Sequence, residues 1–453
     1  MDKIWPVDII DIAETLENAG YEAWLVGGAI RDLLLGQEPN DWDLATDATP
    51  EKMKEVFSEF ATTWQGSRYG TVGVRGAKTS VEITTFRSDS DYSDGRHPDT
   101  VIYSNSIEED LKRRDFTINA IAWNPTYGLL DPMGGAEDIK NRIIRTVGKA
   151  DERFNEDCLR MIRAVRFAGQ LNFSIEDKTI SNISKNAKLI TGVAKERIGV
   201  EFSKILIQPN PKASLNLLKD TRLLEFILPE ANNMVEYEQK SPYHSWTLWE
   251  HTLKTVIGVS PELHLRLAAF FHDIGKPATQ EIDEKGIAHY HGHEKISAEI
   301  AESYIIKFGL GKELSEKVCR LIKRHMLSHA NLATKGYGKI IREIGEDEIP
   351  KLVELWKADR LATLDSRPID DIIEKENKLS ELLELDRVYK KEQLAIDGHD
   401  LLHIGYKQGK IIGEILNCLT EEVMENPSLN DREKLLALAK LTYTIEMGDD
   451  VYG

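Results

Sequence analysis

The apolar pattern of this 453-residue chain changes near residue 147, and this change constrains the fold more than any other feature. Before it, short alternating segments predict strands around 22–27, 41–45, 61–64, 70–76 and 80–86. Helical spacing in the same region predicts helices at 8–20, 29–35 and 50–59. Beyond residue 147, Gly and Pro become less frequent and apolar residues recur at helical spacing almost to the end.

Intermingled strands and helices followed by a long helical region predict an α+β protein. We expect a small mixed β-sheet in an N-terminal head, and mostly α-helical parts after it. Turn clusters such as 208–211 and 365–368 mark candidate boundaries. The expected parts are residues 1–146, 147–225, 226–370 and 371–453.

The net charge of −18 argues against a protein that coats nucleic acid indiscriminately. Residues 111–210, however, carry 17 Lys and Arg against 12 Asp and Glu, so a local basic strip could bind a phosphate backbone. No apolar run approaches the roughly 18 residues of a membrane span. The three cysteines are widely spaced and form no Cys-x-x-Cys pair, which predicts a protein of the reducing cytoplasm.

Two aspartates one residue apart, Asp41 and Asp43, follow a Gly-Gly pair and a short helical segment. On a strand, positions i and i+2 share a face, so both carboxylates could hold Mg²⁺. The turn at Gly27 and Gly28, with Arg31 after it, places backbone N–H groups and a helix start where a triphosphate could lie. This layout predicts nucleotidyl transfer.

Glu82 lies in an alternating segment that predicts a neighbouring strand, and it could add a third carboxylate. Two cations held this way can clamp the attacking and leaving oxygens of an in-line phosphoryl displacement. An isolated Asp-x-Asp pair is more often part of a turn or a helix cap. The combination of strand, Gly-Gly turn, Arg31 and paired aspartates favours the catalytic interpretation.

Residues 113–120 bring two guanidinium groups, a carboxylate and an amide together. Arginine suits phosphate oxygens because its planar fork donates hydrogen bonds in pairs. Asp115 and Asn119 are four residues apart, so on a helix they would share one face and could bind a ribose hydroxyl. A capped surface helix is the alternative. The Gly pair at the end of 131–135 predicts a flexible joint after the sheet, or an ordinary turn.

A second basic run recurs every three residues, at Asp157, Arg160, Arg163 and Arg166. On an α-helix this spacing drifts slowly around the axis, so the four side chains would line one ribbon. A carboxylate with an arginine one turn later offers acceptor and donor groups that can match the Watson–Crick edge of a base. Salt links on a solvated helix are the plainer alternative.

Together, these segments resemble the class II tRNA nucleotidyltransferases, the CCA-adding enzymes, a family related to bacterial poly(A) polymerases. The resemblance covers essentially the whole chain. It implies addition of C, C and A from CTP and ATP to the 3′ end of tRNA, with Mg²⁺ and without a nucleic acid template. The residues that it marks as catalytic, metal-binding or nucleotide-binding are Gly27, Gly28, Arg31, Asp41, Asp43, Glu82, Arg114, Asp115, Asn119, Asp157, Arg160, Arg163 and Arg166.

Within that resemblance, Arg114 corresponds to a phosphate contact, and Asp157 and Arg160 to the protein template that pairs with the incoming base. Arg163 and Arg166 correspond to the phosphate-binding and structural positions that follow. The loop at 91–98 resembles that of members that add A, which argues against a CC-only enzyme and leaves an A-only enzyme open. The tail from residue 396 resembles a helical segment expected to hold the tRNA elbow, and it departs from many relatives at 407–409.

A separate group of imidazole and carboxylate side chains lies in the C-terminal half. Such groups together suit a divalent metal that activates water. The segment 270–277 resembles the HD phosphohydrolase superfamily, whose ligands correspond to His251, His272, Asp273 and Asp359. Residues that could extend the site to two metals are His291, Gly292, His293, Glu294 and His325. The resemblance implies a 3′-end phosphatase or cyclic phosphodiesterase, or a tRNA scaffold that no longer binds metal.

Three rival interpretations remain open. A poly(A) polymerase would share the Asp-x-Asp head, although the acidic balance and the HD segment weigh against it. An HD hydrolase with an inactive head is disfavoured because the head carboxylates are all present. A non-catalytic tRNA-binding protein is the third.

Overall fold

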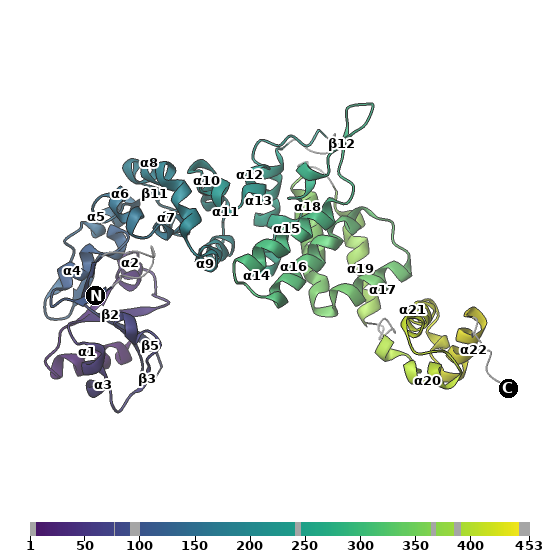
Figure 1. Cartoon of the computed structure of the whole chain (residues 1–453), viewed down its shortest axis with the longest axis horizontal. Helices are drawn as coiled ribbons and strands as arrows, with labels where there is room; N and C mark the ends of the chain where they lie inside the picture. The colour runs from purple at the N-terminus through teal and green to yellow at the C-terminus, as the bar shows by residue number, and fades with distance from the viewer. Residues whose placement is uncertain are drawn as a thin grey trace, which may run out of the picture. The chain divides into compact units, whose positions relative to one another are not determined.

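The computed structural model describes residues 6–76, 78–90, 100–240, 246–363, 368–384 and 391–443. The chain divides into two compact units, residues 1–232 and 233–453, and each is described by itself (Figure 1). The first unit combines a β-sheet with helices, and the second is mostly helical. The prediction of an α+β protein with a sheet near its N-terminus and a helical remainder is confirmed.

Seven strands form the sheet of the first unit, in the order β3-β4-β5-β2-β1-β8-β9. Their bounds are β1 Ala23–Val26, β2 Trp42–Thr46, β3 Ala61–Thr63, β4 Thr71–Arg75, β5 Ser80–Thr85, β8 Ala122–Asn124 and β9 Gly128–Leu130. An antiparallel ribbon outside this sheet joins β6 Arg87–Ser90 to β7 Thr100–Tyr103. Alternation along β5 buries Val81 and Ile83 and leaves Glu82 exposed on the other face.

The pairing of the central strands brings three segments of the candidate site together. β2 is antiparallel to β1 and parallel to β5. In this register Asp43 lies opposite Val26 on one side and Glu82 on the other. Because β1 ends at Val26, the Gly27–Gly28 turn leaves the sheet beside Asp43.

In the described part of the first unit, twelve α-helices pack on the sheet or follow it in the chain. α1 buries Ile9, Ile12 and Leu16, which recur at helical spacing. The bounds are α1 Val7–Asn18, α2 Gly28–Leu34, α3 Pro50–Val56, α4 Ile107–Lys112, α5 Gly135–Asn141, α6 Ala150–Glu156, α7 Leu159–Leu171, α8 Asp177–Asn186, α9 Lys195–Leu206, α10 Lys212–Asp220, α11 Leu223–Ile227 and α12 Pro229–Asn232. Two short parallel strands, β10 Ile143–Ile144 and β11 Ser174–Ile175, pair beside them.

The turn at 131–135 is a tightly packed helix start rather than a flexible joint. The Asp131 carboxylate accepts hydrogen bonds from the backbone N–H groups of Gly135 and Ala136, both at 2.8 Å. A Cβ atom on Gly135 would lie 2.1 Å from the carbonyl oxygen of Thr117. Glycine is therefore required here by the close approach of two backbone segments.

The second unit contains ten α-helices and a short antiparallel hairpin among the described residues. The bounds are α13 Leu248–Gly258, α14 Leu263–Phe271, β12 Glu281–Ile282, β13 Ala288–His289, α15 His293–Lys307, α16 Lys312–Arg324, α17 Thr334–Ile344, α18 Ile349–Leu361, α19 Asp370–Glu384, α20 Gly398–His403, α21 Lys410–Glu425 and α22 Arg432–Thr442. The buried rings of Trp249 and Phe270 meet edge to face at 6.3 Å, which fixes α13 against α14.

The finer division into four parts stays a prediction. The two units meet in the chain at Asn232 and Asn233, and the expected head and neck lie together in the first of them. Within the described residues, none of the helices has the length and apolar character needed to cross a membrane.

Candidate functional site

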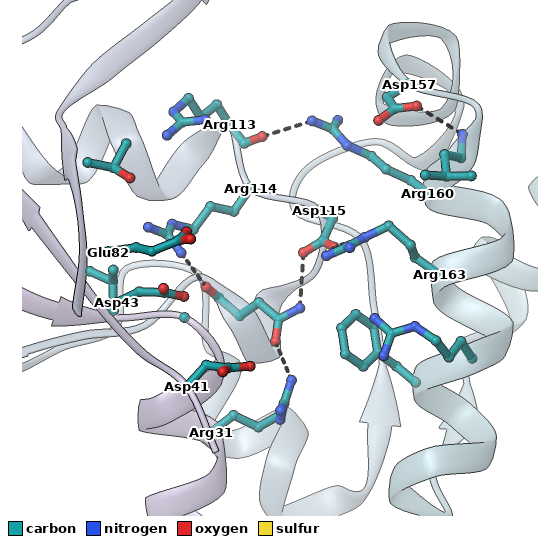
Figure 2. Close-up of a pocket in the computed structure, with 18 of the residues that line it drawn as sticks. Arg31, Asp41, Asp43, Glu82, Arg113, Arg114, Asp115, Asp157, Arg160 and Arg163 are labelled. Atoms are coloured by element: carbon teal, nitrogen blue, oxygen red, sulfur yellow. Dashed lines mark hydrogen bonds and ion pairs between the residues drawn. The ribbon is translucent and has the colours of Figure 1, made fainter. Parts of the chain in front are cut away.

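A cavity of about 640 Å³ in the first unit is lined by every residue that the sequence predicted for the head and neck (Figure 2). Figure 2 shows Asp41, Asp43 and Glu82 on the side of the strands, and Asp157, Arg160 and Arg163 on the side of the helices. Predicted residues as far apart in sequence as Gly27 and Arg166 therefore meet around one space.

The acidic side of the cavity is formed by Asp41, Asp43 and Glu82. Burial, opposed by the positive charge of Arg114 and increased by the negative charges of Glu82 and Asp41, raises the pKa of Asp43 to about 6. A carboxyl group with such a pKa lacks a matching counter-charge, and a divalent cation would supply one. The three carboxylates surround the cavity without forming a group of oxygens within 4.8 Å of one another in the described structure.

The absence of a side chain at Gly27 leaves room for the guanidinium group of Arg114. Gly27 has φ of 72°, and a Cβ atom there would lie 2.9 Å from Nη1 of Arg114. Nη2 of Arg114 forms an ion pair with the buried carboxylate of Asp110 at 3.1 Å. Arg113 binds the other oxygen of the same carboxylate. Asp110 thus anchors both arginines. Sequence analysis did not identify it, although it precedes Arg113 and Arg114 by three and four residues, the spacing at which opposite charges pair on a helix.

A chain of hydrogen bonds runs across the floor of the cavity. Arg31 donates to Oδ1 of Asn119 at 2.9 Å, and the Asn119 amide donates to Oδ1 of Asp115 at 3.1 Å. Arg163 donates to Oδ2 of Asp115 at 2.9 and 2.7 Å. Although burial opposes it, the charge of Arg163 with these hydrogen bonds lowers the pKa of Asp115 to about 2.

The expected helix over 113–120 is wrong, although the contact that it was meant to explain is present. α4 ends at Lys112, and residues 117–119 form a single 3₁₀ turn. Asp115 and Asn119 meet because this tight turn folds the chain back on itself. Both side chains are largely buried, so a capped surface helix is also excluded.

The basic run at 157–166 also differs from the prediction at its first residue. Asp157 has extended backbone angles and lies between α6 and α7, so the four side chains do not lie on one helix. Its carboxylate pairs with Arg197 of α9 at 2.8 Å, and Arg160 pairs with Glu156 at 2.6 Å. The two side chains therefore line the same cavity, each paired with a different partner, while the backbone N–H of Arg160 donates to the carbonyl oxygen of Asp157 at 3.1 Å.

The end of the basic run is fixed by α9 and by an aromatic ring. Nε of Arg166 donates to the buried carboxylate of Glu201 at 2.6 Å, and Arg163 lies 3.8 Å from the same group. The guanidinium carbon of Arg166 lies 4.0 Å from the centre of the Phe167 ring. Sequence analysis did not identify Arg197, Glu201 or Phe167. Arg197 and Glu201 lie on a separate helix, and Phe167, although next to Arg166, resembles an ordinary core residue of α7.

A second cluster, in the second unit, brings four histidines and two aspartates together. Nε2 of His251 lies 3.2 Å from Nε2 of His272, and Nε2 of His293 lies 3.2 Å from that of His325. Asp273 connects the two pairs. Its Oδ2 is 3.3 Å from His251 and 3.2 Å from His272, and its Oδ1 is 3.2 Å from His293 and 3.7 Å from His325. Oδ1 of Asp359 is 3.1 Å from His251.

The histidines of this cluster are oriented for metal binding. The Nδ1 atoms of His272, His293 and His325 lie 2.7–2.8 Å from backbone carbonyl oxygens, and that of His251 lies 3.4 Å from one. Donation through Nδ1 leaves Nε2 available as a ligand. His251, His272 and Asp273 form one group of possible ligands within 4.8 Å, and Asp273, His293 and His325 form a second.

The charges of the cluster are strongly coupled. Burial lowers the pKa of His272, but the charge of Asp273 outweighs it and raises that pKa to about 10. Burial and the charge of His272 lower the pKa of His325 to about 3. Lys276, which sequence reasoning missed, binds Oδ2 of Asp273 at 2.7 Å.

Some predicted residues lie apart from these sites. His291 stacks on His289 at 5.8 Å and belongs to neither group of ligands, and Gly292 and Glu294 flank His293 without joining a group. Gly292 instead precedes α15 with φ of 78°. The loop at 91–98 lies outside the described residues.

A sheet that presents carboxylates to a basic cavity defines a nucleotidyltransferase of the poly(A) polymerase class, and comparisons with known proteins agree. Family models match three segments: "Poly A polymerase head domain" over residues 23–145, "Probable RNA and SrmB- binding site of polymerase A" over 172–235, and "HD domain" over 243–364. The nucleotidyltransferase and HD domains together imply dependence on divalent metal.

Individual relatives show which family of nucleotidyltransferases the chain belongs to. The CCA-adding enzyme of Ligilactobacillus salivarius is 35% identical over 95% of this chain and 95% of the relative. That of Geobacillus kaustophilus is 48% identical over 48% of this chain and 54% of the relative. The crystal structure of the Bacillus stearothermophilus CCA-adding enzyme with CTP matches with a TM-score of 0.73 and 27% identity, covering 96% of each chain. The chain belongs to the family of CCA-adding enzymes.

Proposed function

We propose that this enzyme adds C, C and A in sequence to the 3′ end of tRNA, using CTP and ATP and releasing pyrophosphate. The observation that carries the proposal is the meeting of all the predicted head and neck residues around one cavity. Membership of the CCA-adding family over 95% of the chain supports the same activity. The relative solved with CTP supports a nucleoside triphosphate as donor.

The acidic side of the cavity would carry the chemistry. Asp41, Asp43 and Glu82 would hold Mg²⁺, which fits the raised pKa of Asp43 in its absence. When bound, such ions favour the deprotonated 3′-hydroxyl and neutralise charge that develops on the phosphates. Arg114 would contact phosphate oxygens, since Asp110 holds its guanidinium beside Asp43 and the Gly27 turn. Positioning and charge neutralisation then supply most of the barrier reduction.

The helix side would select the base. Asp157 offers acceptor oxygens, and Arg160 offers N–H groups beyond those bound to Glu156 and to the carbonyl oxygens of Arg153 and Arg113. These groups can match the Watson–Crick edges of cytosine and adenine. Asp115 and Asn119 would position the ribose. The ion pair with Arg163 holds Asp115 in place, and Asp115 in turn holds Asn119 by a hydrogen bond.

The partners and the location follow from this activity. The helical parts after the head, expected at 147–225, 226–370 and 371–453, would grip the acceptor stem and elbow of tRNA by shape and backbone charge. Because tRNA and nucleoside triphosphates are the substrates, we propose that the enzyme works in the cytoplasm.

Transcripts of tRNA that end at the discriminator base, at C and at CC test the proposal when each is incubated with CTP or ATP. We expect two C residues on the first transcript, one on the second, and a single A on the third. An A-adding enzyme would extend only the third, and a poly(A) polymerase would add a long tail. Asp41→Ala together with Asp43→Ala should abolish all additions, whereas full activity in that variant would contradict the proposed site.

A second activity, metal-dependent phosphate ester hydrolysis, is supported by the His and Asp cluster of the second unit. Four inward Nε2 atoms and a carboxylate between the two pairs suit two divalent cations. We infer hydrolysis of a 2′,3′-cyclic phosphate at an RNA end. Hydrolysis should require added metal and be lost in His272→Ala and Asp273→Ala. No hydrolysis by the wild type, or undiminished hydrolysis by both variants, would favour a scaffold role instead.

A further inference from the structure

Two buried cations, Arg360 of α18 and Lys375 of α19, lie beside the His and Asp cluster and have no part in the proposed chemistry. Arg360 directly follows Asp359 in the chain, and the two cations are only 6% and 7% exposed. They share the carboxylate of Asp371, with Nη1 of Arg360 2.9 Å from Oδ1 and Nζ of Lys375 3.4 Å from Oδ2. Two buried cations with one carboxylate between them are costly for the fold, so packing alone does not account for them.

Both cations donate hydrogen bonds to the same backbone carbonyl group. Nζ of Lys375 lies 2.9 Å from the carbonyl oxygen of Ser328, and Nη2 of Arg360 lies 3.5 Å from it. Ser328 belongs to the 3₁₀ turn His325–His329, whose first residue is a possible metal ligand. The buried cations are therefore connected to the cluster through the backbone that carries one of its histidines.

The place of His325 in the cluster depends on this turn. Its Nδ1 lies 2.7 Å from the carbonyl oxygen of Ile322, and its Nε2 lies 3.7 Å from Asp273, the longest of the four distances between a histidine and that carboxylate. Nε1 of Trp356, on α18, donates to the carbonyl oxygen of Arg324 at 3.1 Å. Side chains of α18 and α19 thus bind the backbone on both sides of His325.

The two groups of possible ligands are the His251 group, with His272 and Asp273, and the His325 group, with Asp273 and His293. We propose that Lys375 is a positioning residue for the His325 group: by binding the carbonyl oxygen of Ser328, it sets where Nε2 of His325 meets a cation. The inference rests on the proposed metal-dependent function of the cluster and deepens it. Groups that orient a metal ligand without touching the metal commonly change metal affinity by about tenfold or more.

Of the two cations, Lys375 is the one that acts on the His325 group alone. Arg360 follows Asp359, whose Oδ1 is 3.1 Å from His251, so loss of Arg360 would disturb both groups. Lys375 lies on α19, which contributes no ligand to either group. Its replacement should therefore change the affinity for one cation and leave the other unchanged.

A purely structural role for Lys375 would be to hold α19 in place. Ile372, Leu379 and Leu382 of the same helix are buried and already serve this purpose. In that role an apolar side chain of similar length would serve at least as well, because it avoids the cost of burying a charge. If packing were its only task, Lys375→Met would keep both the fold and the affinity for both cations.

The test compares Lys375→Met with Lys378→Met in the full-length protein, which also carries Asp41→Ala and Asp43→Ala so that the head does not bind the added cation. Lys378 lies on the same helix and pairs with Glu381 at 2.6 Å in a solvent-accessible ion pair. The metal-free proteins are titrated with Co²⁺ alone, and binding is followed by calorimetry and by the visible absorption of the bound ion. We expect two Co²⁺ ions per chain in the parent protein and in Lys378→Met. In Lys375→Met, one ion should bind as in the parent and the other at least tenfold more weakly.

Lys375→Arg should restore part of the lost affinity, because it keeps a buried donor for the carbonyl oxygen of Ser328. Thermal unfolding in EDTA checks the fold of each variant, and Lys375→Gln, which is shorter and uncharged, takes the place of Lys375→Met if that variant does not fold. Unchanged binding of both ions in the folded variants, or an equal weakening of both, would overturn the inference.

Failure of the proposed hydrolysis is a separate outcome. If the parent protein binds two Co²⁺ ions and hydrolyses no 2′,3′-cyclic phosphate, the proposed hydrolase fails, and the effect of Lys375 on metal affinity still decides the inference. If the parent protein binds no Co²⁺, both are overturned.

Discussion

The ionisation of Asp43 depends on what the cavity holds. Its carboxyl group is partly buried between Glu82 and the end of β1, and Arg114 compensates only part of its charge. Folding the protein without a cation therefore places an insufficiently balanced negative charge in this site. Such a site favours cation binding at the expense of stability in the metal-free state.

Asp43→Asn should abolish nucleotide addition and yet stabilise the metal-free protein at pH 8. The folded-state pKa of about 6 lies above the ordinary value of 3.8 for an aspartate, so the ionised group destabilises the fold above pH 6. This rise in pKa corresponds to a loss of about 3 kcal/mol in the free energy of unfolding. The loss is fully present at pH 8, becomes smaller as the pH falls below 6, and is absent below pH 3.8. Thermal unfolding in EDTA at several pH values measures it. Asp41→Asn is the control, since Asp41 is exposed and its replacement should change stability little.

Gly27→Ala should impair catalysis by displacing Arg114. A Cβ atom at Gly27 would come within 2.9 Å of Nη1 of that arginine. Alanine at φ of 72° and ψ of −133° is strained by about 1–3 kcal/mol. Gly36→Ala is a control for a positive φ without a contact, because Gly36 has φ of 71° with no atom within 4 Å of the added Cβ.

Both glycine variants should lose stability in thermal unfolding, and only Gly27→Ala should lose tenfold or more in kcat/KM for CTP. Equal activities of the two would mean that the Gly27 turn matters for its backbone conformation alone.

At the scale of elements, α7 and α9 form the frame of the basic side of the cavity. The ion pair of Glu201 with Arg166 is largely buried, and Arg163 lies close to the same carboxylate. Removal of one partner of such a pair leaves an uncompensated charge in a poorly solvated place. The stability of the packing between α7 and α9 should therefore depend on Glu201.

Glu201→Ala is expected to destabilise the first unit by about 3 kcal/mol, because Arg166 remains buried without its carboxylate. The control Glu225→Ala removes the partner of Arg222 in an exposed ion pair at 3.0 Å and should cost less than about 1 kcal/mol. Urea unfolding of the two variants provides the comparison. A similarly small loss of unfolding free energy in both variants would show that solvent reaches the ion pair of Glu201 with Arg166.

The elements also show what sequence could predict. β5 alternates apolar and polar residues, and β1 is a short apolar run, so both strands could be predicted from sequence. Asp41 precedes β2, which begins at Trp42, so the predicted strand began one residue too early. β8 and β9 have three residues each, too few for a period to emerge. The approach of Asp43 to Glu82 depends on strand register, and that of Asp157 to Arg197 spans 40 residues. Neither contact has a local signal, because each is decided by tertiary packing.

At the scale of the whole molecule, the two candidate sites belong to different compact units. Among the described residues, the cavity of the first unit is lined by residues up to Lys204, and the His and Asp cluster is formed by residues after Asn233. Each unit has its own buried core of apolar side chains. No side chain is shared between the two sites, so one activity should not need the other.

We therefore expect the two activities to separate cleanly by mutation. Asp41→Ala with Asp43→Ala should abolish CCA addition and leave hydrolysis of a 2′,3′-cyclic phosphate intact. Asp273→Ala should abolish hydrolysis, because it removes the carboxylate that connects both histidine pairs, and leave CCA addition within about twofold of wild type. Both reactions are measured on the same preparation, with thermal unfolding as a check on folding. Loss of CCA addition in a well-folded Asp273→Ala protein would mean that the His and Asp cluster supports CCA addition and is not an independent hydrolase.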